Sequence, residues 1–207
     1  IINSGNVFSY IFQFSLARFT SVENFGLYNS ISSILMYFSA LVATLPYFVT
    51  KILNEDESKY QIWNFLFLII LIVNLIIIIF HIFILDFLGF DEKSYFYYIY
   101  SIINLSILLS FLTGFLQFNK NYNKFSIIIS LQMLFRFIVL VIFFLTFKNI
   151  TVHHALLSNL FPLFIILIIA IYFSYKLLPN FIISLSNINF SFIKNFFNNF
   201  LPIYINN

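Results

Sequence analysis

Arg136 is the residue with the clearest chemical consequence in this sequence, because it lies in the middle of a long apolar run. The run from Phe125 to Phe147 is long enough to cross a hydrocarbon core about 30 Å thick, which takes roughly 20 apolar residues in a helix. A cation at the centre of such a segment costs about 2.5–3.5 kcal/mol on insertion scales. A chain tolerates this cost where the guanidinium faces the protein interior, a partner or a water-filled cavity.

Gln132 precedes Arg136 by one helical turn and so lies on nearly the same face of the predicted helix. One interpretation is that this face lines an internal cavity that receives an anionic group, such as a phosphate. The other is that Arg136 is structural and bonds to neighbouring carbonyls or to amides such as Asn74, Asn104 or Gln13. Ionisable residues inside membrane segments are functional by default, which favours the first interpretation.

Four further amides interrupt apolar runs: Gln13, Asn74, Asn104 and Gln117. Amides between membrane helices commonly bond to each other, which contributes about 0.6 kcal/mol per contact. We interpret Asn74 and Asn104 in this way. Gln13 and Gln117 each stand on a polar helix face, which is equally typical of cavity lining and of helix packing.

The remaining titratable residues do not form a pattern that supports catalysis or metal binding. His153 and His154 are adjacent, so on a helix their side chains point about 100° apart and cannot easily bind one ion. The chain has no cysteine, which excludes thiolate metal sites and a catalytic thiol, and it has no phosphate-cradling glycine loop or zinc-ligand spacing. The sequence therefore predicts no metal, no cofactor and no enzymatic activity.

The composition predicts an all-α, polytopic membrane helix bundle. Of the 207 residues 62% are hydrophobic and 8% are charged, and the mean hydropathy is +1.01. A soluble domain has about 25% charged residues, so this chain cannot form a water-soluble surface. The net charge of +3 is small and scattered, which argues against nucleic acid as a partner.

Six apolar segments are predicted to span the membrane, joined by short polar links. They comprise residues 1–17, 25–50, 62–85, 95–118, 125–147 and 154–176, and we expect the first to be truncated. A seventh begins near residue 192 and is cut off after residue 203. The chain starts inside an apolar segment without Met, so we expect it to be a fragment of a longer membrane protein.

Two of these segments have faces of small and polar residues that predict close helix packing. In the second span this line comprises Asn29, Ser33, Met36, Ala40, Ala43, Thr44 and Tyr47, and in the fourth span Ser106, Ser110, Thr113, Gly114 and Gln117. Pro46 lies within the second span. Because proline has no N–H, we expect it to bend the helix and to free the carbonyl of Val42.

Three short motifs occur in an order that is similar to a known family. Leu16-Ala17-Arg18 followed by residues 21–28, Ser-Val-Glu-Asn-Phe-Gly-Leu-Tyr, resembles the first-loop signature of polysaccharide (O-antigen-type) flippases. Residues 114–117, Gly-Phe-Leu-Gln, and residues 201–203, Leu-Pro-Ile, are similar in kind, as is an arginine in the fifth span. These flippases belong to the multidrug/oligosaccharidyl-lipid/polysaccharide exporter superfamily, which also holds drug–cation antiporters.

The resemblance implies two six-helix bundles around a central cavity, with 12 or 14 spans in the full protein. Residues 1–176 would then form the first bundle, residues 177–191 a linker and residues 192–207 the start of the second bundle. The implied activity moves a lipid-linked oligosaccharide from the cytoplasmic to the outer leaflet of a bacterial inner membrane. Membrane lipid surrounds such a protein, and a glycan polymerase or glycosyltransferases are possible partners.

The resemblance also implies roles for individual residues. Arg136 would bind the pyrophosphate of the substrate, with Gln132, Gln13 and Gln117 as candidate polar residues of the cavity. Arg18 matches the family signature at the outer mouth, or else pairs with Glu23 and fixes the loop. Many family members have more basic residues inside the first bundle than the single one found here.

Two other functions remain open on the sequence alone. A drug or organic-cation antiporter of the same fold would need a buried carboxylate, and Asp86, at the end of a span, is the only acid near one. A non-transporting membrane assembly subunit would use the small-residue faces for helix packing alone.

Overall fold

The computed structural model describes residues 2–54, 62–88 and 94–178. The predicted seventh span, residues 192–207, lies outside this part of the chain, as does the predicted linker after residue 178. The link after the second span, which contains Glu55, Asp56 and Glu57, also lies outside it.

The described residues form six helices and no strand beyond an isolated bridge between Thr20 and Ile150. The helices are α1 (Ile2–Phe19), α2 (Val22–Asn54), α3 (Ile62–Leu88), α4 (Ser94–Phe118), α5 (Tyr122–Phe147) and α6 (Val152–Ser174). This confirms the all-α prediction, with each helix close to a predicted span.

The link between the first two spans, predicted over residues 18–24, is shorter than expected. Only Thr20 and Ser21 separate α1 from α2. The hydroxyl of Ser21 accepts a hydrogen bond from the backbone N–H of Asn24 at 3.3 Å, so Ser21 caps the start of α2. The cap explains why the second helix begins three residues before its apolar run.

Helices α2 to α6 are long and apolar enough to cross a membrane, which makes the chain a multi-pass membrane protein. The 18-residue α1 is not among the helices that meet this criterion in the described part of the chain. The 33 residues of α2 span about 50 Å at 1.5 Å per residue, more than the hydrocarbon core alone requires.

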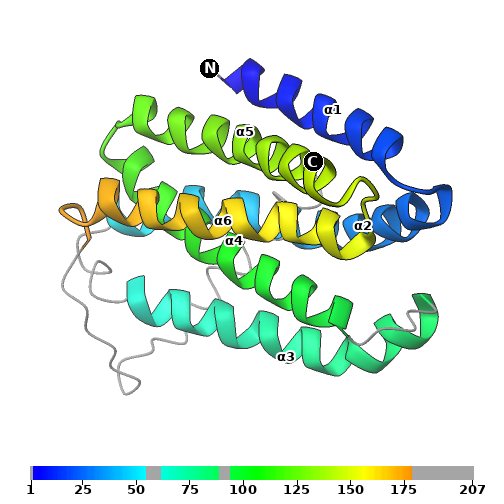
Figure 1. Cartoon of the computed structure of the whole chain (residues 1–207). Coiled ribbons are helices and arrows are strands. Elements are labelled where there is room, and N and C mark those ends of the chain that lie inside the picture. Colours follow the sequence, from blue (N-terminus) through cyan, green and yellow to red (C-terminus); the bar gives the residue numbers. More distant parts are fainter. Residues whose placement is uncertain (1, 55–61, 89–93, 179–207) are drawn as a thin grey trace.

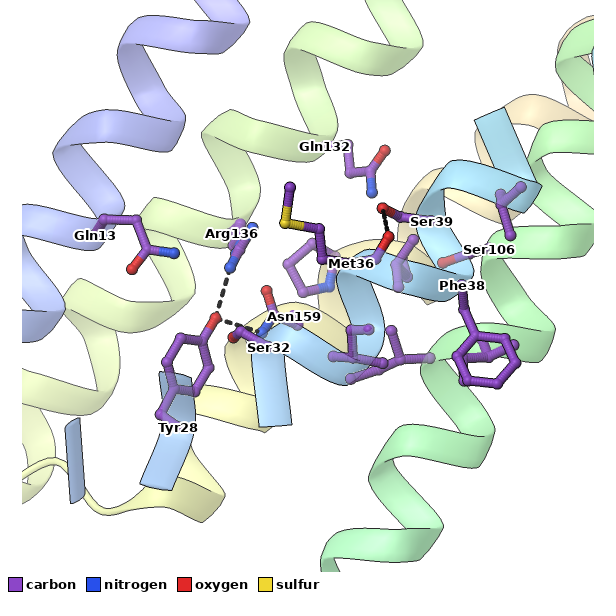
Figure 2. Close-up of a pocket in the computed structure, with 16 residues that line it drawn as sticks. Gln13, Tyr28, Ser32, Met36, Phe38, Ser39, Ser106, Gln132, Arg136 and Asn159 are labelled. Atoms are coloured by element: carbon purple, nitrogen blue, oxygen red, sulfur yellow. Dashed lines mark hydrogen bonds between the residues drawn. The ribbon is translucent and has the colours of Figure 1, made fainter. Parts of the chain in front are cut away.

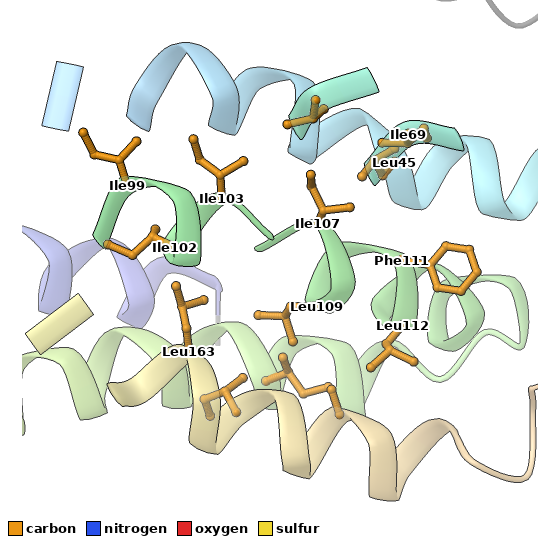
Figure 3. Packing of buried hydrophobic residues seen from close by; sticks show 14 of the residues in the cluster. Leu45, Ile69, Ile99, Ile102, Ile103, Ile107, Leu109, Phe111, Leu112 and Leu163 are labelled. Carbon is orange, nitrogen blue, oxygen red and sulfur yellow. The ribbon is translucent and has the colours of Figure 1, made fainter. Parts of the chain in front are cut away.

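The bundle is organised around α4, in which 67% of an 18-residue apolar window is buried, against 11% of the corresponding window of α5. Figure 1 shows α1 and α5 together on one side and α3 on the opposite side, with α4 and α6 between them. In Figure 3, Ile103 and Ile107 of α4 lie on the side of α2, whereas Leu109 and Leu112 lie on the side of α6. The apolar core therefore extends along both sides of α4.

The contact between α2 and α4 is close because Gly114 has no side chain. A Cβ atom added at Gly114 would lie 2.6 Å from the Cβ of Val49 and 3.1 Å from the Cα of Pro46. One turn earlier, the Ser110 hydroxyl donates a hydrogen bond to the Val42 carbonyl at 2.6 Å. This is the carbonyl that Pro46 was expected to free, and α4 supplies its new partner.

The small and polar line predicted on α2 does not pack as expected within the described residues. Ser33, Ala40 and Ala43 are exposed, and Met36 is 74% exposed. The face of α4 behaves differently, since Ser110, Thr113 and Gly114 are all buried. The packing predicted for the face of α4 is confirmed, whereas the packing predicted for the line on α2 is wrong, because periodicity does not tell which polar face has a neighbour.

Asn74 of α3 and Asn104 of α4 form the predicted amide link. Each side-chain amide donates to the other's oxygen, at 3.3 Å and 3.0 Å, and Asn104 also donates to the Tyr100 carbonyl at 2.9 Å. The pair therefore joins two apolar helices without leaving an amide oxygen unpaired.

Candidate functional site: a pocket around Arg136

A half-open pocket of about 330 Å³ lies between the helices and is lined by residues of α1, α2, α4, α5 and α6 (Figure 2). We refer to it as the Arg136 pocket. One part of its wall is apolar and includes Leu35, Ile102 and Leu163. The polar lining residues are Gln13, Tyr28, Ser32, Ser39, Ser106, Gln132, Arg136 and Asn159.

Contacts from two other helices fix the guanidinium of Arg136. Its Nη2 donates a hydrogen bond to the Tyr28 hydroxyl of α2 at 2.6 Å. Its Cζ lies 3.9 Å from the ring centroid of Phe12 of α1, a cation–π contact that covers one face of the group. In the described residues, no carboxylate pairs with Arg136, so its charge is not neutralised.

Tyr28 links the arginine to a third helix. Its side chain is fully buried, and its hydroxyl also accepts a hydrogen bond from the Asn159 amide of α6 at 3.0 Å. The same amide lies 3.3 Å from the Ala155 carbonyl of its own helix. One phenolic oxygen thus joins α2, α5 and α6 beside the pocket.

The pocket contains three of the five residues that the sequence singled out. Arg136 and Gln132 reach it from α5, and Gln13 reaches it from α1 (Figure 2). Gln117 is half-buried in the last turn of α4 and does not line the pocket. Arg18 is exposed at the end of α1, with its Cζ 5.5 Å from the Phe14 ring, and it forms no ion pair with Glu23.

Sequence reasoning missed Phe12, Tyr28 and Asn159 as parts of this site. Tyr28 ends the motif that resembles the flippase signature, which was the one signal available for it. Phe12 is one of 32 phenylalanines, so its type alone could not distinguish it. Asn159 lies in an apolar span without a polar neighbour one turn away on the same face to mark it.

Comparison with protein families identifies the chain. A family described as "Polysaccharide biosynthesis protein" matches residues 2–203, nearly the whole length. The chain belongs to this family. The match fits the polysaccharide flippase branch of the exporter superfamily and confirms that resemblance. No curated protein and no solved structure matches the chain.

As a polysaccharide biosynthesis protein, the chain has a membrane role in the biosynthesis or export of polysaccharide. The matched region includes every residue of the Arg136 pocket. Several polar groups of this pocket have no hydrogen-bond partner among the described residues: the amides of Gln13 and Gln132 and the hydroxyls of Ser32 and Ser106. They are available, together with the arginine, to a polar or anionic ligand.

His153 and His154 lie in the first turn of α6 and do not line the pocket. Nδ1 of His154 accepts a hydrogen bond from the Thr151 backbone N–H at 3.3 Å, which completes a capping arrangement. The His153 ring centroid lies 4.9 Å from that of Tyr95 and 5.6 Å from that of Tyr98. Capping and ring packing therefore account for both residues.

Proposed function

We propose that this protein moves a lipid-linked oligosaccharide across the bacterial inner membrane by alternating access, and that Arg136 binds the pyrophosphate of the substrate. The role is transport rather than catalysis. The observation that carries the proposal is a guanidinium without a described counter-charge, held on the wall of a half-open pocket between the helices of a membrane bundle.

The physical reason lies in the cost of moving an anion through lipid. An isolated charge loses its hydration in hydrocarbon, so a protein that carries it must replace the water with other donors. Arg136 supplies a positive charge, and Gln13 and Gln132 supply N–H groups with no partner in the described residues. Charge-assisted hydrogen bonds of this kind are stronger than neutral ones.

The volume of the pocket limits which part of the substrate it holds. Pockets for drug-sized ligands measure about 300–1,000 Å³. At about 330 Å³ the Arg136 pocket lies at the low end of that range. We therefore assign to it the charged phosphate portion, while the lipid and most of the sugar units extend beyond it.

The lining of the pocket weighs against the organic-cation antiporter. A cation site would need a carboxylate, and no Asp or Glu is found among the described residues that line this pocket. The charged residue that lines this pocket is Arg136, which repels a cationic drug. Glycan polymerase and glycosyltransferases remain partners that we expect from the proposed pathway.

The test is complementation of a host strain that lacks this protein. We expect Arg136→Gln to lower surface glycan at least tenfold, because the neutral side chain leaves the phosphate without a counter-charge. Arg136→Lys keeps the charge and should retain part of the activity. The control is Lys124→Gln, which removes an exposed cation of the same helix outside the pocket.

Membrane levels of each variant must be measured alongside surface glycan by immunoblotting. Normal export by Arg136→Gln at a normal protein level would overturn the assignment of the pyrophosphate to this arginine. Cationic-dye efflux coupled to protons or sodium would support the antiporter instead.

A further inference from the structure

The fully buried hydroxyl of Tyr28 has a more specific relation to Arg136 than helix packing requires. It accepts hydrogen bonds from Arg136 Nη2 at 2.6 Å and from the Asn159 amide at 3.0 Å (Figure 2). Arg136 and Asn159 lie 108 and 131 positions from Tyr28 in the sequence. Two donors on one oxygen leave the phenol with little freedom to turn.

The three guanidinium nitrogens of Arg136 differ in whether they are free to donate a hydrogen bond to a ligand. Nη2 is engaged by Tyr28, and Nε is buried without a hydrogen-bond partner. Phe12 covers one face of the guanidinium. Nη1 is neither enclosed nor paired in the described part of the chain, so it is the nitrogen that an anion in the pocket would meet.

We propose, on the basis of the function proposed above, that Tyr28 is the positioning residue that directs Arg136 Nη1 at the phosphate of the substrate. Arginine has many rotamers, and its binding to an anion requires one of them to be selected. The hydroxyl of Tyr28 selects it before the ligand arrives, and Asn159 holds that hydroxyl in place. Preorganisation of this kind raises affinity because the arginine side chain is already ordered before the ligand binds and loses less conformational entropy on binding.

A purely structural role for Tyr28 is the alternative that the experiment must separate. The ring is fully buried and its centroid lies 6.4 Å from that of Phe12, so a large truncation would disturb the core. Tyr28→Phe keeps the ring and removes the hydroxyl alone. Asn159 then still has the Ala155 carbonyl at 3.3 Å, so the substitution does not orphan its amide.

The experiment is a double-mutant cycle on the purified protein in lipid nanodiscs, with inorganic pyrophosphate as the probe and calorimetric titration as the measurement. The variants are Tyr28→Phe, Arg136→Gln and the two combined. We expect Tyr28→Phe to weaken pyrophosphate binding about tenfold, the size expected for a lost hydrogen bond to a charged group. In the Arg136→Gln background the same change should have no further effect, because Tyr28 acts through the arginine.

The control for loss of a hydroxyl from a buried tyrosine is Tyr95→Phe, on α4 and outside the pocket, which should leave pyrophosphate binding unchanged. Thermal unfolding of every variant is recorded, and we expect Tyr28→Phe to unfold within a few degrees of the parent. If Tyr28→Phe does not accumulate, Asn159→Ala removes the other donor to the same oxygen and is put through the same cycle.

The outcomes separate this inference from the function on which it rests. If Arg136→Gln weakens binding but Tyr28→Phe does not, the positioning role is wrong and the anion site stands. The positioning role is also wrong if Tyr28→Phe weakens binding equally with and without Arg136. If Arg136→Gln binds pyrophosphate like the parent, the assignment of an anion site to Arg136 is wrong.

Discussion

The two halves of α2 make opposite kinds of contact with the rest of the bundle. In the second half, Pro46 and Val49 pack closely against Gly114 of α4, and the Val42 carbonyl accepts the Ser110 hydroxyl. We call this contact the seam. In the first half, Ser32 and other residues of α2 line the Arg136 pocket, and the lining continues as far as Val42, where the seam begins.

The difference between the seam and the pocket lies in how completely their polar groups are paired. In the seam, the one carbonyl that proline frees has a serine as its partner. In the pocket, Gln13, Gln132 and Ser32 have no partner in the described residues, and Arg136 has one for Nη2 alone. A polar contact that is complete fixes two helices, whereas an incomplete one leaves donors for a ligand.

The largest change in stability is expected at Gly114, because the seam has no room for a side chain. In Gly114→Ala the new Cβ would lie 2.6 Å from the Val49 Cβ, so the helices must move apart. Overpacking of this kind costs about 1–3 kcal/mol of unfolding free energy. The measurement is equilibrium unfolding in lipid or detergent.

Gly26, in the first half of α2, provides the matched control for that substitution. A Cβ there would meet nothing within 4 Å. Because glycine inside a helix is less favourable than alanine, Gly26→Ala should leave stability unchanged or raise it by up to about 1 kcal/mol. Equal effects at the two glycines would show that the seam is not closely packed.

A smaller loss is expected for Ser110→Ala, which removes the partner of the carbonyl freed by Pro46. A polar group left unpaired inside a bundle costs about 1 kcal/mol when its neighbours adjust in part. Ser33→Ala is the control, since the Ser33 hydroxyl is exposed and donates within its own helix at 2.9 Å. If the two alanine variants unfold at the same denaturant concentration, the carbonyl has found another partner.

The sequence predicted the seam better than the pocket, for a physical reason. In the seam, a freed carbonyl follows from one proline and the helix repeat. Outside the seam, the pairing of Asn74 with Asn104 was predicted for a similar reason, since both are amides that interrupt long apolar runs. Hydropathy likewise fixed the helices, because the length of an apolar run is set by the membrane. These features depend on residues that are close in sequence or alike in type.

The pocket depends instead on distant residues whose types gave little signal. Tyr28 and Asn159 meet at Arg136 from helices that are far apart in the chain. A polar face repeats along the whole length of a helix, whereas a pocket occupies only part of it. This explains why Gln13 reaches the Arg136 pocket but Gln117, on an equally polar face, does not.

The smallest change in stability is expected from Ser32→Cys. This substitution introduces a unique reactive thiol, because the 207 residues contain no cysteine. If the Arg136 pocket is filled with water, a membrane-impermeant maleimide should label this cysteine. Ser110→Cys, in the buried seam, should stay unlabelled under the same conditions. Inorganic pyrophosphate should slow the labelling of Ser32→Cys several-fold, since it would occupy the same space. An unreactive Ser32→Cys would mean that the pocket is closed to water, and a dry pocket could not hold a phosphate beside Arg136.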